Sequence, residues 1–182
     1  MFERFELMAG YNTWMNERLY ECASKLTDEE RKADRGAFFG SIHRTLNHIM
    51  LADEIWLGRF TAKPFEAASL DQELHADFDA LWAARRALDA RIEAWVATLT
   101  EEALRGDLRY RRMSSPDEVS LPLGVAVQHF FNHQTHHRGQ ITTLLTQAGH
   151  DVGVTDVVYF AANVFLPKRA VSAVGGGPAA SR

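Results

Sequence analysis

Apolar residues recur every three to five positions along most of the chain, a spacing typical of helices that bury one face. The pattern predicts four long helices, at about residues 2–26, 41–60, 71–99 and 122–148. Modest loops join them, so we expect an all-α fold in which the four helices form a bundle around one core. An acid interrupts the apolar stripe of the second helix, where Asp53 takes a core-facing position.

Three shorter elements complete the predicted fold. Thr27, followed by acidic residues, has the character of an N-cap and predicts a short helical piece. Residues 107–121 alternate apolar and charged positions around the turn sequence SSPDE, which indicates a short β-hairpin before the last long helix. A final short helix is expected to begin near Thr155. We therefore predict one bundle domain over residues 1–166 and a flexible tail, rich in Gly, Ala and Ser, over 167–182.

Two sets of charged residues need an interpretation. The third helix carries one set, predicted to form a solvated face: Arg85, Arg86, Asp89 and Arg91. The hairpin region carries a basic set: Arg105, Arg109, Arg111 and Arg112. We interpret the basic residues as exposed strand positions, with binding of an anion or a substrate as the alternative.

The composition indicates a soluble globular protein. Of 182 residues, 46% are hydrophobic, which is sufficient for the core of a single domain. The net charge of −4 argues against nucleic acid as a partner, because phosphate affinity depends on concentrated Lys and Arg. No stretch approaches the roughly 18 apolar residues of a membrane span, and the first residues lack a secretory signal, so we expect a cytoplasmic protein without a membrane partner. The single cysteine, Cys22, has no neighbouring base or cation that would activate its thiol.

The stretch FFNHQTHHRGQI, residues 130–141, contains three of the chain's eight histidines. His133 and His137 continue the apolar stripe of the fourth helix, and a spacing of four residues brings their imidazoles within about 40° of each other around the axis. Such pairs are a recurring metal-binding device. A metal site open to chemistry usually has about three protein ligands, and His48 can point into the bundle from the second helix.

The alternative is that these histidines are hydrogen-bonded core residues, the commoner state of a lone buried histidine. Two adjacent inward imidazoles would each need a partner, because an unpaired buried polar group costs about 1–3 kcal/mol, and one ion satisfies both. His129, one turn before His133, is a rival ligand or a group that contacts the ligands. The remaining histidines are expected at the rim of the site (His136) and at the surface or at helix caps (His43, His75 and His150).

These segments resemble the DinB family, the DinB/YfiT-like metalloenzymes. HFFNHQTHHRGQITTLL resembles that family's nHxxHHRGQ motif, and YNTWMNERL, TLNHIMLADEIWLGRF and TDVVYF resemble its other helices. The resemblance implies an up-down-down-up bundle, commonly a homodimer, in which His48, His133 and His137 hold a divalent metal. The pattern also includes Arg138, Gly139 and Gln140, where a small residue permits close packing and the polar pair binds across a helix or subunit contact.

The expected cofactor is a divalent metal, zinc or nickel first, with iron or manganese as alternatives. Three neutral imidazoles leave the ion its full charge, which would acidify a bound water or thiol. By resemblance, the first hypothesis is an S-transferase-like enzyme that uses a low-molecular-weight thiol and a small-molecule substrate, with Asp53 or His129 as a group that contacts the ligands. The second is a metal-dependent hydrolase, with Asp53, Glu54 or His129 as proton acceptor. The third is a non-catalytic, dimeric stress-response binding protein with a structural metal.

Overall fold

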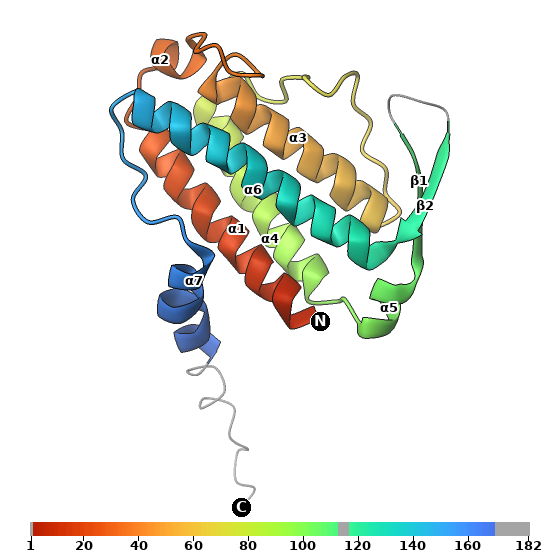
Figure 1. Cartoon of the computed structure of the whole chain (residues 1–182). Coiled ribbons are helices and arrows are strands. Elements are labelled where there is room, and N and C mark those ends of the chain that lie inside the picture. The colour runs from red at the N-terminus through yellow and green to blue at the C-terminus, as the bar shows by residue number, and fades with distance from the viewer. Residues whose placement is uncertain (1, 113–116, 170–182) are drawn as a thin grey trace, which may run out of the picture. The chain divides into compact units, whose positions relative to one another are not determined.

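The computed structural model describes residues 2–112 and 117–169. Its main body is a bundle of four long helices (Figure 1): α1 Phe2–Ala23, α3 Ile42–Phe60, α4 Phe78–Val96 and α6 Leu123–Gln147. α1 and α3 each pack against both α4 and α6. Along the chain the helices run up, down, down and up, so α3 lies antiparallel to α6, the helix that contains the FFNHQTHHRGQI segment. The predicted all-α bundle is confirmed.

Short elements cover the two ends of the bundle. α2 Asp28–Lys32 begins at the expected cap, where the side chains and backbones of Thr27 and Glu30 form a reciprocal capping box. α5 Glu101–Arg105 precedes an antiparallel hairpin of β1 Asp107–Arg111 and β2 Glu118–Pro122, in which Tyr110 pairs with Val119. The hairpin is confirmed, and residues 113–116, which include the first three of the predicted turn, lie outside the described residues.

The chain divides into two compact units, one ending at Val152 and the other beginning at Gly153. The second unit contains α7 Val157–Phe160, the wider helical turn η1 Ala161–Phe165 and a helical continuation over 166–169. The division falls inside the domain predicted over residues 1–166. Most of the predicted tail, residues 170–182, lies outside the described residues. No helix among the described residues is long and apolar enough to cross a membrane.

The third long helix begins later than predicted, at Phe78 with Asp77 as its N-cap. The preceding loop is held by a buried amide of α3: Asn47 Oδ1 accepts from the backbone N–H groups of Leu74 and His75, both at 2.9 Å. Its Nδ2 donates to the carbonyl of His75 at 3.1 Å. One side chain thus satisfies three backbone groups and keeps this loop out of the helix.

The solvated face predicted for this helix is wrong for two of its residues, Arg85 and Asp89, which are buried. Arg85 forms ion pairs of 2.7 Å with Asp53 of α3 and with Asp89. Asp89 also accepts hydrogen bonds from the amides of Asn12 (2.9 Å) and Asn16 (3.0 Å) on α1. Burial raises the pKa of both carboxyls, that of Asp53 to about 6, although the guanidinium opposes the shift.

The network continues to the fourth helix, where the guanidinium of Arg138 donates to Asn12 Oδ1. Arg138 is buried and also donates to Thr135 at 3.2 Å. This buried polar chain therefore joins all four long helices. It fixes α3 and α6 relative to each other next to the histidines that they carry.

Candidate metal centre

His48 of α3 meets His133 and His137 of α6 in the bundle. One ring nitrogen from each residue lies within 4.8 Å of the others, and the Nε2 atoms of His133 and His137 are 3.1 Å apart. The ring centroid of His48 lies 4.6 Å from that of His137 and 5.3 Å from that of His133. The structure thus brings together the three residues that the sequence indicated as ligands.

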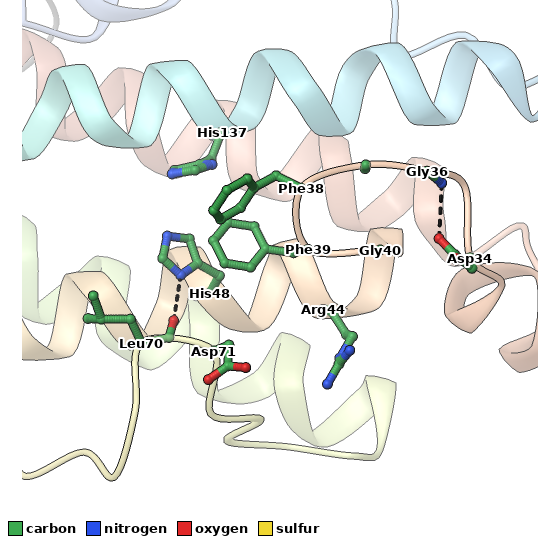
Figure 2. Close-up of a pocket in the computed structure, with 11 residues that line it drawn as sticks. Asp34, Gly36, Phe38, Phe39, Gly40, Arg44, His48, Leu70, Asp71 and His137 are labelled. Carbon is green, nitrogen blue, oxygen red and sulfur yellow. Dashed lines mark hydrogen bonds between the residues drawn. The ribbon is translucent and has the colours of Figure 1, made fainter.

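Two of these imidazoles are held in a defined orientation by acceptors at Nδ1. The Leu70 carbonyl lies 2.8 Å from His48 Nδ1 (Figure 2), and Gln140 Oε1 lies 2.8 Å from His137 Nδ1. Because a carbonyl oxygen only accepts, each Nδ1 carries the proton and each Nε2 presents a lone pair. Such an acceptor behind the ring is the usual support of a metal-binding histidine.

The cluster favours neutral imidazoles. Burial lowers the pKa of all three histidines, and neighbouring histidines lower the pKa of His133 and His137 further. The effect is largest for His133, whose pKa falls to about 3. At neutral pH the three rings are therefore uncharged, which is the state that binds a metal.

The donor set fits a divalent transition metal. A zinc ion binds imidazole nitrogen at about 2.0–2.1 Å, so two nitrogens on one tetrahedral ion lie about 3.4 Å apart, close to the separation of His133 and His137. Without an ion, one hydrogen bond between these two rings leaves the Nε2 lone pair of His48 without a donor among the described residues. Three nitrogen donors suit zinc, nickel, iron or copper better than the oxygen-seeking magnesium or calcium.

A cavity of about 820 Å³, here called the Phe39 cavity, opens on one side of the cluster. Its wall includes His48, His137 and Leu70, and the loop residues Phe38 and Phe39. Both aromatic side chains point from the loop toward the two histidines (Figure 2). The ring of Phe39 stacks on that of His48, with centroids 3.8 Å apart, and covers this face of the cluster.

The loop that carries these two phenylalanines turns tightly. Gly36 and Gly40 have φ angles of +66° and +78°, values that residues with a Cβ rarely adopt. Three polar residues line the outer part of the same cavity: Asp34, Arg44 and Asp71.

A second cavity, of about 280 Å³ and here called the Arg59 cavity, reaches the cluster along His48 and His133. Its other side chains are mainly aromatic and basic: Trp56, Arg59, Tyr110, Arg112 and His129. His48 and Leu70 line both cavities, so the cluster lies where the two meet.

The proton acceptors considered from the sequence lie at different distances from the cluster. Asp53 is buried against Arg85 and lines neither cavity. Glu54 pairs with Arg91 at 2.6 Å. His129 is exposed in the Arg59 cavity, with its ring centroid 5.9 Å from that of His133.

The other histidines and the thiol are only partly as expected. His136 is exposed at the rim, as predicted. The prediction for His43 is wrong: it is fully buried, and its Nε2 lies 3.0 Å from the His75 carbonyl. Cys22 is buried, and burial raises the pKa of its thiol, which makes it a poor nucleophile.

Sequence reasoning did not assign the supporting roles of Leu70 and Phe39. For Gln140 a signal existed, because it follows His137 by three residues and so lies beside it on the helix. Leu70 acts through its backbone carbonyl, which no side-chain pattern reports.

Similarity to known proteins identifies the family. The DinB family profile matches residues 1–167 of the chain. The chain belongs to the DinB family. Protein DinB of Bacillus subtilis (strain 168) is 29% identical over 155 residues, which cover 80% of this chain and 87% of that protein. In this DinB chain the family's histidine motif lies on α6.

Two solved structures share the DinB fold. A DinB-like protein from Bacillus cereus ATCC 10987 is 22% identical and superposes with a TM-score of 0.56, covering 78% of this chain and 91% of that one. YfiT from Bacillus subtilis is 16% identical with a TM-score of 0.59, covering 81% and 89%. YfiT is described as a probable metal-dependent hydrolase with an unusual four-helix bundle topology.

Proposed function

We propose that this protein is a divalent-metal-dependent enzyme that activates a small nucleophile, a thiol or water, for attack on a small-molecule substrate. The observation that carries the proposal is the convergence of three imidazoles at the junction of two cavities. His48, His133 and His137 would hold the ion. Its chemistry would be that of a Lewis acid, which makes a weakly acidic nucleophile reactive at neutral pH.

The protein's own groups would orient the ligands and limit access of water. The Leu70 carbonyl and the Gln140 amide fix two rings from behind. Phe39, stacked on His48, shields one face of the cluster. Among the described residues that line the Arg59 cavity, His129 is the one imidazole besides the ligands, so we assign it as proton acceptor.

The two cavities favour transfer to or from a thiol as the first candidate reaction. A transferase must seat two organic molecules beside the ion, whereas a hydrolase needs only one besides water. The cavities of about 820 and 280 Å³ share His48, so two molecules can approach the same centre. Hydrolysis is the second candidate, supported by the fold shared with YfiT, the probable metal-dependent hydrolase.

Elemental analysis of protein purified without an affinity tag is the first test. About one zinc or nickel ion per chain is expected, with iron or manganese as the alternatives. Absence of bound metal, together with unchanged thermal stability in chelator, would contradict the proposal.

A turnover screen then separates the reactions. The metal-loaded protein is assayed with a thiol and an electrophile, and separately with esters and amides. Turnover should disappear in His133→Ala and persist in His136→Ala, a matched change at an exposed site on the same helix. If His133→Ala lowers only the melting temperature, and no substrate pair turns over, the non-catalytic protein with a structural metal is the better account. We also propose a homodimer, which sedimentation velocity tests directly.

A further inference from the structure

The Arg59 cavity has an unusual charge distribution. Two guanidinium groups line it, from Arg59 at the end of α3 and Arg112 just after β1. No acidic side chain lines it, and neither arginine forms an ion pair among the described residues. The Phe39 cavity differs, because Asp34 and Asp71 accompany its single arginine. The smaller cavity therefore carries uncompensated positive charge.

Arg59 is held in place with donors to spare. Its guanidinium carbon lies 4.6 Å from the ring centroid of Trp56 and 4.3 Å from that of Tyr110. Nη2 makes one long hydrogen bond, 3.5 Å, to the carbonyl of Arg111. A guanidinium has five N–H groups, so most of those on Arg59 can still bind a ligand. Stacking on aromatic faces fixes its plane and leaves its edge, where these groups lie, available.

The arginines of the hairpin region lie on two different faces. Along β1, Leu108 and Tyr110 are partly covered, whereas Arg109 and Arg111 are exposed. The alternation of a strand places Arg112 on the same face as Tyr110, toward the cavity, and Arg109 on the opposite face. Only one member of this basic set therefore reaches the cavity.

We propose that Arg59 and Arg112 form a carboxylate-binding subsite that anchors an acidic, flat, apolar molecule beside the metal centre. A carboxylate can accept two parallel hydrogen bonds from an arginine guanidinium. Trp56 and Tyr110 provide aromatic surface for the body of the ligand. The volume of about 280 Å³ leaves room for a single ring that carries a carboxylate, such as benzoate. His48 and His133 lie at the inner end, where the reacting group would sit.

The role of this ligand as a substrate rests on the proposed function, but its binding does not. Binding is therefore measured first on chelator-treated protein, by calorimetry with benzoate, phenylacetate and hexanoate. At least one should bind with a Kd of about 1 mM, as expected for so small a ligand. Arg59→Gln should weaken binding about tenfold or more, and Arg112→Gln by a smaller factor. Arg109→Gln removes the same charge from the opposite face and should leave the Kd unchanged.

Neutral and ring-free probes complete the test. Benzamide and inorganic phosphate should each bind at least about tenfold more weakly than benzoate, because one lacks the charge and the other lacks the apolar body. Circular dichroism and the melting temperature show whether Arg59→Gln remains folded. If it does not, binding of benzoate is measured in Arg112→Gln and Arg59→Lys instead. The lysine keeps the charge but cannot form two parallel hydrogen bonds to a carboxylate.

Three outcomes would overturn the subsite: no binding of any of the three acids, equal binding of benzamide, or unchanged binding in the arginine variants. None of these results depends on metal. Conversely, a protein that binds benzoate in this way but neither holds metal nor turns over any substrate would retain the subsite and refute the proposed enzyme.

Discussion

The Nε2 atoms of His133 and His137 face each other at 3.1 Å across one turn of α6. Two imidazole nitrogens at this separation either share one proton or share one metal ion. The proton alternative leaves His48, whose ring approaches both, without a donor to its Nε2 among the described residues. The geometry therefore fits one ion shared by the three imidazoles.

Removal of one ligand should largely abolish metal binding. His137→Ala leaves two donors, and we expect the affinity for zinc to fall by at least about 100-fold, beyond what loss of a supporting group costs. Competition with a chromophoric chelator measures the change. His136→Ala, next to it on the exposed face, removes only a contact of 3.4 Å with the Gln140 amide and should lower the affinity far less. Equal losses in the two variants would contradict the assignment of His137.

Loss of the hydrogen-bond acceptor behind a ligand should weaken metal binding almost as much as loss of the ligand. Gln140→Ala removes the acceptor at His137 Nδ1, so the ring is no longer held with its lone pair toward the site. We expect metal affinity to fall about 10- to 100-fold while the fold is retained. Gln128→Ala is the matched control, because within the described parts of the chain its amide hydrogen-bonds Asn132 alone, on the exposed face of the same helix. Unchanged metal affinity in Gln140→Ala would exclude the supporting role.

The sequence predicted the long helices and the histidines that cluster between them because both depend on local periodicity. His133 and His137 are placed together by one helical turn, and His48 lies beside the apolar stripe of its own helix, from where it can point into the bundle. Features that depend on a distant partner could not be predicted in this way. The third helix begins late because Asn47, on the preceding helix, binds the loop before it.

The burial of polar residues was the other feature that the sequence did not predict. Arg85 and Asp89 are spaced like exposed helical ion pairs, and periodicity does not distinguish a solvated pair from one packed in a core. Asp53 was the one available signal, because an acid on an apolar stripe needs a buried cation. The sequence does not indicate which arginine provides it. The same limit explains why Asp53 was considered for the active site.

Loss of the buried cation should strongly destabilise the bundle. Arg85→Met leaves two carboxyls in the core without their common partner, and we expect the free energy of unfolding to fall by about 3–5 kcal/mol. Urea denaturation at pH 7 measures it. Arg86→Met is the control: its pair with Glu17 is partly exposed, so its loss should lower the free energy of unfolding much less. Asp53→Asn combined with Arg85→Met should recover part of the loss, and no recovery would argue against unpaired charge as the cause.

Acid should destabilise the metal-free protein in part through His133. Its pKa is about 3 in the folded chain, because of burial, against about 6.5 when unfolded. Between these values the unfolded state binds more protons, so the free energy of unfolding rises with pH and is lost on acidification. One site contributes a slope of at most about 1.36 kcal/mol per pH unit. Asp53, with its pKa raised to about 6, acts in the opposite direction between about pH 4 and 6.

Comparison with a variant isolates the histidine from this opposing effect. Chelator-treated wild type should lose stability between pH 6.5 and 4 more steeply than His133→Gln, which keeps a polar side chain but cannot titrate. The contribution of Asp53 is common to both proteins and cancels in the difference. Urea denaturation across this pH range gives the two slopes. His136→Gln, an exposed site, should follow the wild type. Parallel curves for wild type and His133→Gln would mean that His133 is not held neutral by burial, and would remove one argument for a preformed metal site.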